Sequence, residues 1–202
     1  MPEEYLKTLA LFDFDGTLTR KDTFLELIKF VHGKNPFYKG ILKLAPYLFL
    51  FKIKVLPNWK VKEKVLIHFF KGMPYDLFQD HCNRFAMEII PTLMRKDALT
   101  ELEKLQSMGT RIIIVSASSE NWILPWSNRL KIECIASKME IAGGTLTGKL
   151  SGKNCYGMEK VIRIKETTDL SKYSVIYAFG DSKGDLPMLK LATKPFYRTF
   201  KK

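Results

Sequence analysis

The chain has 202 residues, 46% of them hydrophobic and 27% charged, which suffices for one apolar core and excludes collagen-like, low-complexity and wholly disordered proteins. The formal net charge of +12 favours anionic partners, namely phosphorylated metabolites, acidic lipid surfaces or nucleic acid, although a basic protein without a charged partner fits the charge equally well. The three cysteines show neither metal-binding spacing nor a disulfide framework, so we expect reduced thiols and a cytosolic protein.

The start of the chain and its most apolar stretch both argue against membrane insertion. Residues 1–10 lack the basic region and the long apolar run of a secretory signal. Within the apolar stretch 41–56 the longest uncharged run is Leu44–Phe51, whereas a spanning helix needs about 20 apolar residues. We therefore expect neither a signal peptide nor a transmembrane helix.

Three short runs, each rich in β-branched or aromatic residues and each ending at small or polar residues, are predicted to be buried strands: residues 8–13, 111–115 and 174–179. A helix is predicted over residues 97–108, with Gly109 as the residue that ends it. This alternation predicts an α/β fold with a doubly wound, Rossmann-like parallel sheet. Ligands of such sheets bind beyond the carboxyl ends of the strands.

Residues 21–90 have a different pattern, because they are helix-permissive, rich in Phe, Leu, Ile and Lys, and contain no clear buried strand. We predict an all-helical cap over residues 21–90, inserted into a core made of residues 1–20 and 91–202. The glycine-rich segment 143–152 is predicted to be a β-hairpin or a loop excursion.

The strongest chemical signal is the segment Asp13-Phe-Asp15-Gly16-Thr at the end of the first predicted strand. Two carboxylates two residues apart on a continuing strand share one face, and Gly16 permits a sharp turn. One carboxylate can attack phosphorus, and the second can protonate the leaving oxygen and later activate water. The alternative is a strand-end turn in which both aspartates cap local amides.

A second pair of carboxylates, Asp181 and Asp185, follows the third predicted strand. Mg²⁺ prefers oxygen ligands and is often held by one or two carboxylates together with a phosphate. The alternative is the N-cap of a helix, a position that Asp and Ser favour.

Two further residues could bind a phosphate group. Ser116 ends the second predicted strand, and its hydroxyl with the amides of Ala117 and Ser118 could hold phosphate oxygens, unless it is an ordinary N-cap serine. Lys160 lies early in a helix-like run and could neutralise phosphate charge, although a single lysine usually faces solvent.

The order of these signals resembles that of the haloacid dehalogenase (HAD) superfamily, whose four motifs match DFDGTLT, IIIVSAS, GMEK and GDSKGDLPML. The resemblance covers residues 8 to 191. The length of the insertion after the first motif resembles the phosphoserine-phosphatase-like branch with its helical cap. The basic, apolar composition of the cap and of residues 135–160 is similar to enzymes of the phosphatidylglycerophosphatase C type.

The resemblance implies specific roles for four aspartates. Asp13 would be the nucleophile and a Mg²⁺ ligand, and Asp15 would be the general acid and base, with its main-chain carbonyl also on the metal. Asp181 would be a further Mg²⁺ ligand, and Asp185 would support the water shell of the metal. The second aspartate of the first motif, absent from HAD dehalogenases, favours a phosphatase or a phosphomutase.

The resemblance also implies that Ser116 and Ala117 bind the transferring phosphoryl group and that Lys160 stabilises it. The match to phosphoserine phosphatases is incomplete, since those enzymes usually have Ser where this chain has Gly16 and Gly where it has Ala117. They also use a cap arginine for the substrate carboxylate, for which Lys64 is the nearest candidate here.

The functional prediction is therefore an enzyme, a Mg²⁺-dependent phosphatase that acts on a phosphomonoester through an aspartyl-phosphate. Its substrate would be a lipid phosphate, such as phosphatidylglycerophosphate, or a soluble phosphoserine-like metabolite. A phosphotransferase of the same family and a lipid-surface-binding protein with an idle HAD core are the alternatives. We expect a cytoplasmic protein, with peripheral contact at the inner membrane surface as an alternative, and neither nucleic acid nor an obligate protein partner.

Residues 34–64 contain eight lysines and one glutamate, interleaved with six aromatic residues. Three interpretations remain open: a cap whose aromatic residues form its own core, an interfacial helix that approaches anionic lipid, and a nucleic-acid surface with aromatic stacking. The lipid interpretation predicts that Ile41–Leu56 forms an amphipathic face exposed toward the mouth of the active site.

Overall fold

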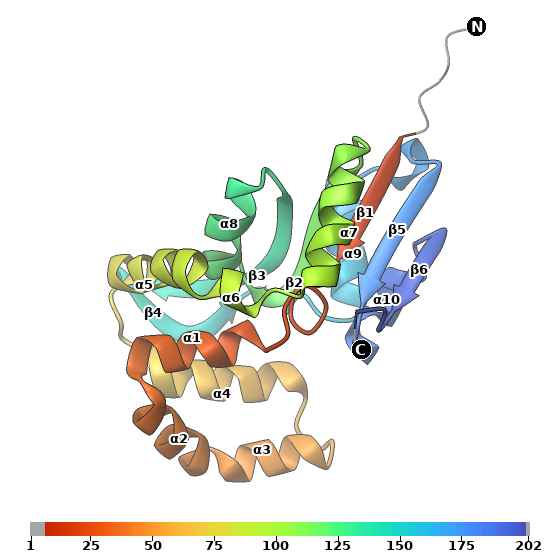
Figure 1. Ribbon diagram of the computed structural model, residues 1–202. Helices are drawn as coiled ribbons and strands as arrows, with labels where there is room; N and C mark the ends of the chain where they lie inside the picture. Colours follow the sequence, from red (N-terminus) through yellow and green to blue (C-terminus); the bar gives the residue numbers. More distant parts are fainter. Residues whose placement is uncertain (1–6, 201–202) are drawn as a thin grey trace, which may run out of the picture.

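The computed structural model describes residues 7–200 and contains a six-stranded sheet (Figure 1). The strands, in chain order, are β1 (Thr8–Phe12), β2 (Arg111–Ser119), β3 (Glu133–Ala142), β4 (Thr145–Ser151), β5 (Val175–Gly180) and β6 (Lys194–Tyr197). Their order across the sheet is β4-β3-β2-β1-β5-β6, and all neighbours are parallel except β3 and β4. The doubly wound α/β fold is thus confirmed, with one antiparallel strand at its edge.

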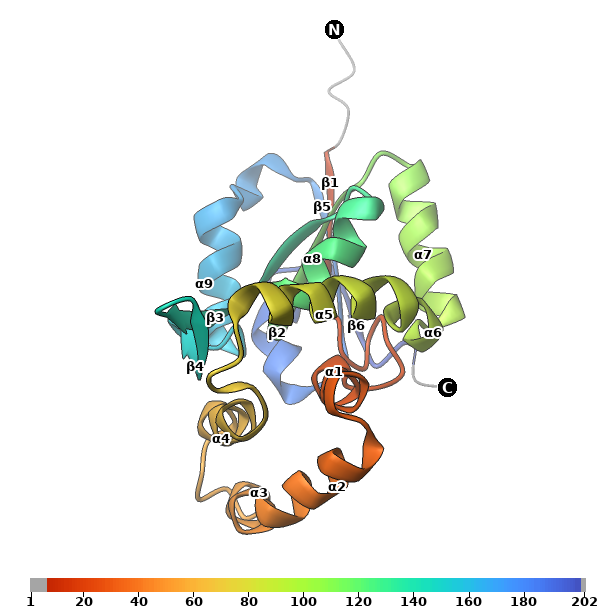
Figure 2. The ribbon, with the colours of Figure 1, turned by 90° about the vertical axis from the view of Figure 1, so that its left-hand side faces the viewer.

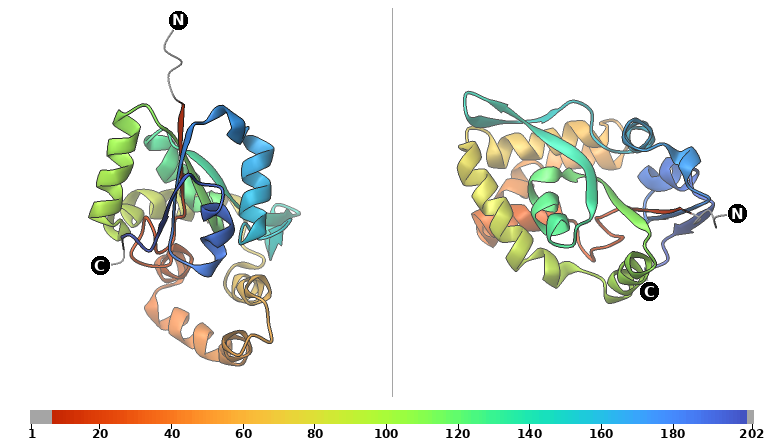
Figure 3. Two further views of the ribbon diagram at one scale, coloured as in Figure 1. Left: turned by 90° about the vertical axis from the view of Figure 1, so that its right-hand side faces the viewer. Right: turned by 90° about the horizontal axis from the view of Figure 1, so that it is seen from above.

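The helices that accompany the sheet in the core are α6 (Ile90–Leu93), α7 (Lys96–Ser107), α8 (Glu120–Arg129), α9 (Met158–Thr167) and α10 (Leu186–Leu189). Alternate residues of a strand face opposite sides of the sheet. Ala10 and Phe12 of β1 therefore pack in the cluster that contains α7 and α8, whereas Leu9 and Leu11 pack in a second cluster with α9 and α10. Figures 2 and 3 show α7 and α9 on opposite sides of the sheet.

Five helices follow β1 and form the cap: α1 (Thr23–His32), α2 (Lys34–Lys43), α3 (Ala45–Lys52), α4 (Asn58–Phe70) and α5 (Tyr75–Glu88). Helices α2 and α3 form the layer farthest from the sheet, with α1 and α4 between them and the core (Figures 1 and 2). The prediction of an all-helical insertion agrees with this arrangement. Cap and core share one apolar cluster, which contains Phe12 and Phe14 as well as Phe70 and Phe78 of the cap. Because this cluster contains residues of both parts, the predicted boundaries between cap and core at residues 20 and 91 stay a prediction.

Several predicted elements differ from the observed ones in their extent. The strand predicted to stop at residue 115 continues to Ser119, and the hairpin predicted over residues 143–152 is the turn and strand β4 paired with β3. Strands β3 and β6 were not predicted. Strand β6 is a short edge strand that contains Pro195, and its sequence pattern is correspondingly weak.

Within residues 7–200, no helix combines the length and apolar content that crossing a bilayer requires. Residues 1–6, which belong to the segment expected to lack a secretory signal, lie outside the described residues. Cys82, Cys134 and Cys155 form no disulfide, and Cys82 and Cys155 are buried.

Candidate active site

The carboxyl ends of β1, β2 and β5 open into a cleft of about 480 Å³ between the sheet and the cap. All residues predicted to act in catalysis, phosphate binding or metal binding line this one cleft: Asp13, Asp15, Ser116, Ala117, Lys160, Asp181 and Asp185. They come from segments far apart in the sequence. Parallel pairing of the three strands brings these segments together, because it places all three carboxyl ends at the same edge of the sheet.

Asp13 is the first residue after β1, and the backbone holds it firmly. Its amide donates to the carbonyl of Phe179 at 2.9 Å, so the chain leaves the sheet in register with β5. One carboxylate oxygen accepts from Thr17 Oγ1 at 3.1 Å, and the other accepts from Lys160 Nζ at 2.7 Å. Burial raises the pKa of Asp13 to about 7, although Lys160 acts in the opposite direction.

Lys160 is almost completely buried, with 1% of its surface exposed. It lies in the first turn of α9, and its ammonium donates to three acceptors: Asp13 Oδ1 at 2.7 Å, Asp185 Oδ1 at 2.6 Å and the carbonyl of Val115 at 2.7 Å. Burial alone lowers the pKa of Lys160, but the two carboxylates more than offset this effect and keep the ammonium charged. The possibility of a solvent-facing lysine is therefore ruled out.

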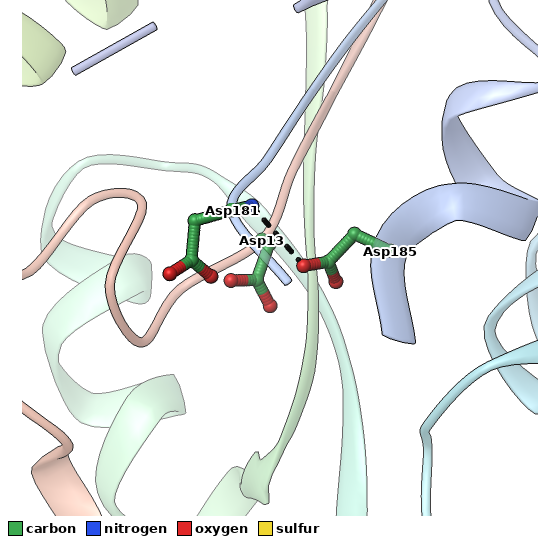
Figure 4. Close-up of side chains that lie close together, drawn as sticks. All are labelled: Asp13, Asp181 and Asp185. Carbon is green, nitrogen blue, oxygen red and sulfur yellow. Dashed lines mark hydrogen bonds between the residues drawn. The ribbon is translucent and has the colours of Figure 1, made fainter. Parts of the chain in front are cut away.

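Asp13, Asp181 and Asp185 each offer a carboxylate oxygen to one small group in which these atoms lie within 4.8 Å of one another, as Figure 4 shows. All three residues are buried. Lys160 pairs with two of these carboxylates, those of Asp13 and Asp185. A buried, oxygen-only set of ligands fits a hard divalent cation such as Mg²⁺.

Among the described residues, Asp185 is held by more donors than Asp13, with four against two. Its Oδ2 accepts from the amides of Asp181 and Ser182 and from Ser182 Oγ, at 3.2, 2.9 and 2.8 Å, while its Oδ1 accepts from Lys160. Both oxygens are thus occupied by donors. The alternative of a helix cap holds in part, since Ser182 and Asp185 form a capping box on the short 3₁₀ segment Lys183–Asp185.

Asp15 lines the same cleft, but its carboxylate accepts hydrogen bonds from different residues than the carboxylate of Asp13 does. Strand β1 ends at Phe12, so the two aspartates do not lie on one face of a continuing strand, and that expectation was wrong. The carboxylate of Asp15 accepts from the amide of Thr23 at 2.6 Å and from Ser118 Oγ at 2.5 Å. It therefore connects the first residue of cap helix α1 to the end of β2.

Ser116 and Ala117 occupy an irregular part of β2, where the register with β3 shifts. Helix α8 begins only at Glu120, and Ser119 rather than Ser116 is its N-cap, so the alternative of a capping role for Ser116 was wrong. The hydroxyl of Ser116 accepts from the amide of Ser118 at 3.0 Å. Ser116 is 1% exposed at the base of the cleft.

The structure adds a cap lysine that sequence reasoning missed. Lys62 lines the cleft and donates to the carbonyl of Ala117, whereas Lys64, the nearest candidate from the sequence, is exposed outside it and lies against the Tyr47 ring. Burial lowers the pKa of Lys62, while the Asp15 carboxylate opposes this effect. Helical spacing could have identified it, because Lys62 lies four residues before buried Leu66 and Lys64 does not share that face.

The fold, the four motifs and their convergence in one cleft define the class of protein. The chain belongs to the haloacid dehalogenase-like hydrolase family, whose sequence profile matches residues 10–190. It is an enzyme of phosphatase type within this family, as the following relatives indicate.

Protein CicA of Caulobacter vibrioides is 32% identical to the chain over 195 residues, which cover 96% of this chain and 86% of CicA. A probable phosphatase of Mycobacterium tuberculosis is 26% identical over 196 residues, covering 91% of this chain and 66% of that protein. A phosphoserine phosphatase, solved as a phospho-aspartyl intermediate analogue, has a TM-score of 0.66 at 20% identity, covering 93% of this chain and 84% of that one. The phosphoserine-phosphatase-like fold is thereby confirmed, while the similarity to phosphatidylglycerophosphatase C stays a prediction.

Proposed function

We propose that this enzyme is a Mg²⁺-dependent phosphatase that hydrolyses phosphomonoesters through an aspartyl-phosphate on Asp13. The observation that carries the proposal is the buried carboxylate group with Lys160 set into it. A nucleophile, cation ligands and a fixed ammonium then surround the point where an anionic phosphoryl group must react. The phosphoserine phosphatase of similar fold was solved as the analogue of a phospho-aspartyl intermediate, which supports the covalent route.

The reaction has two half-reactions. In the first, a carboxylate oxygen of Asp13 attacks phosphorus, the bond from phosphorus to the ester oxygen breaks, and Asp15 donates a proton to the departing alkoxide. In the second, Asp15 takes a proton from water, the water oxygen attacks phosphorus, and inorganic phosphate leaves as Asp13 is regenerated. Ser116 would donate to a phosphoryl oxygen. The Lys160 ammonium, which donates to Asp13, Asp185 and the Val115 carbonyl, would stabilise the phosphoryl group by its positive charge, and Asp185 positions it.

Asp13 and Asp181 would hold the cation, together with the main-chain carbonyl of Asp15. Bound Mg²⁺ would neutralise charge on the carboxylates and on the phosphoryl group, so that one anion can approach another. Asp185 would support this site rather than bind the cation, because four donors from the chain hold its carboxylate, against two for Asp13.

Hydrolysis of p-nitrophenyl phosphate tests the metal requirement. Chelation with EDTA is expected to abolish activity and added Mg²⁺ to restore it, because the anionic phosphoryl group must approach the Asp13 carboxylate and the cation would lower the repulsion between them. The Asp181→Ala variant is expected to need at least about tenfold more Mg²⁺ for half-maximal rate. The exposed Asp169 provides the matched control, Asp169→Ala, whose requirement should equal that of the wild type. Full activity after chelation contradicts the proposal.

The Asp15→Asn variant separates the two half-reactions. Asparagine can keep an acceptor for the Thr23 amide, but it cannot donate or take the catalytic proton, so kcat is expected to fall roughly 10²- to 10⁴-fold. Because p-nitrophenolate leaves without a proton, the first half-reaction should still proceed and give a burst of one product per enzyme before turnover stalls. Slow turnover without a burst contradicts the role of Asp15 in hydrolysing the intermediate.

Lys62 is expected to help close the cap over the bound phosphoryl group. Its ammonium joins α4 to the Ala117 carbonyl, so Lys62→Met should lower kcat/KM roughly 10- to 100-fold, as expected for loss of a charge-assisted hydrogen bond. The matched control on the same helix is Lys64→Met, which should change kcat/KM for a soluble substrate less than twofold, about the scatter between preparations. Equal kinetics of the two variants contradict this role.

A further inference from the structure

The exposed apolar side chains of the protein are concentrated in one part of the cap. Of the seventeen large hydrophobic side chains that are exposed among the described residues, eight fall within residues 38–59. We call this set the cap surface, and its members are Tyr38, Leu42, Tyr47, Phe49, Phe51, Ile53, Val55 and Trp59. Monomeric proteins rarely expose a large contiguous apolar area unless it binds something.

Helix α3 shows that packing within the cap does not account for this surface. Seven of its eight residues are apolar or aromatic, yet none of the eight is buried. By contrast, α1 buries four residues against the rest of the protein. The aromatic residues of the cap therefore form its core only in part: Phe37 is 6% exposed, whereas Phe49 is 61% exposed.

The same segment carries positive charge without compensation. Residues 34–60 contain six lysines, and no acidic residue occurs between positions 27 and 62. Among the described residues, no ion pair involves a lysine of residues 34–60. A surface that combines exposed apolar side chains with unpaired lysines is complementary to an anionic bilayer. Its apolar side chains can enter the boundary of the acyl chains while its lysines contact the anionic headgroups.

The cap surface is continuous with the active-site cleft. Leu48 and Phe51 of α3 line the cleft, and Phe51 is also 41% exposed at the surface. The same wall includes Phe24, Leu25 and Val65 from α1 and α4. An apolar path therefore leads from the outer layer of the cap, formed by α2 and α3 in Figure 2, into the cleft that holds the carboxylates.

We propose that the cap surface docks on an anionic lipid bilayer and that the substrate is a phosphomonoester of an amphiphile, taken up with its apolar part along Leu48 and Phe51. This inference rests on the proposed phosphatase function. A second copy of the chain fits this surface less well, because it would bring two sets of lysines together. Nucleic acid fits less well too, because Leu42, Ile53 and Val55 offer no ring on which a base could stack.

Flotation with lipid vesicles tests the docking surface. Vesicles of phosphatidylcholine and phosphatidylglycerol are expected to carry the protein upward, whereas vesicles of phosphatidylcholine alone are not. Replacing Lys43 and Lys52 by Gln should weaken binding about fivefold for each charge. Added salt should weaken it as well, since it screens charges within about 8 Å at physiological ionic strength. The matched control replaces the exposed Lys165 and Lys190 by Gln and should leave binding unchanged.

A second pair of variants tests the apolar contribution. Phe49→Ser with Ile53→Ser is expected to weaken vesicle binding roughly tenfold or more for each side chain. The matched double variant, Met108→Ser with Ile162→Ser, removes similarly exposed side chains that lie outside the cap. It should leave vesicle binding unchanged. The inference is overturned if the protein does not bind anionic vesicles, or if both double variants bind like the wild type. It is also overturned if the cap surface instead binds DNA or RNA, or a second copy in sedimentation equilibrium.

Kinetics distinguish the substrate class from the phosphatase function itself. Lysophosphatidic acid in anionic vesicles is expected to give a kcat/KM about tenfold or more above that for phosphoserine, because the bilayer concentrates enzyme and substrate together. Phe49→Ser with Ile53→Ser should lower this rate and leave p-nitrophenyl phosphate hydrolysis unchanged. If p-nitrophenyl phosphate is hydrolysed but the lipid is not preferred, this inference fails and the proposed function stands. If neither is hydrolysed, the proposed function fails.

Discussion

The Asp13→Asn variant is expected to lose hydrolysis of every phosphomonoester, by roughly 10⁴- to 10⁶-fold in kcat, while keeping its fold. An amide cannot form the acyl phosphate. Four donors from the chain hold Asp185, and Thr23 and Ser118 hold Asp15, so neither of these two carboxylates is set to replace it. Steady-state rates with p-nitrophenyl phosphate measure the loss.

The matched control for this variant is Asp169→Asn. Asp169 caps a short 3₁₀ segment outside the cleft, and Asn is an equally good cap, so activity and stability should both stay at the level of the wild type. Circular dichroism of both variants establishes that the fold is retained. Turnover of Asp13→Asn within tenfold of the wild type contradicts the assignment of the nucleophile.

Lys160→Met is expected to have the largest effect on stability of any single substitution in the site. It leaves Asp13 and Asp185 buried without their common ammonium, and breaking a buried ion pair from one side costs about 3–5 kcal/mol. Urea unfolding in the presence of EDTA measures this loss in the free energy of unfolding. The loss should shrink when Mg²⁺ is added, because the cation compensates part of the same charge.

The exposed Lys165 lies five residues further along the same helix and provides the control. Lys165→Met should change the free energy of unfolding by less than about 0.5 kcal/mol, as is usual for a surface substitution. Equal stability of the Lys160 and Lys165 variants contradicts a network in which Lys160 balances two carboxylates.

The composition of the cleft could be predicted from the sequence because it depends on sheet topology. Asp13, Ser116 and Asp181 each follow a strongly apolar run, and parallel strands bring their carboxyl ends to one edge. Lys160 was harder to predict, since nothing in its local sequence distinguishes a buried lysine from an exposed one. The order of the four motifs provided the evidence that single residues did not.

The predictions that were wrong concern the residues at which individual strands end. The place where a strand ends depends on hydrogen bonds with its neighbours, and Asp15 lies beyond the end of β1 because pairing stops at Phe12. Likewise β2 continues past Ser116 because its register with β3 shifts and then resumes at Ser119. Neither event has a marker in the residues themselves.

The cap could be predicted as helical, and the spacing of the apolar residues in α4 could have distinguished Lys62 from Lys64. Lys62 lies on the side of the helix from which Val65 and Leu66 pack inward. The exposure of α3 could not be predicted, because an apolar helix in a sequence is usually buried. Whether its side chains pack inside the cap depends on tertiary contacts that have no marker in the residues themselves.

Trapping of the intermediate tests the central claim most directly. The Asp15→Asn variant is mixed with p-nitrophenyl phosphate and Mg²⁺, quenched in acid and reduced with borohydride, which converts an aspartyl phosphate to homoserine. Peptide mass spectrometry is expected to find homoserine at position 13, in proportion to the burst of product, and none in the Asp13→Asn variant. Product release with unmodified Asp13, or modification at another carboxylate, contradicts the account.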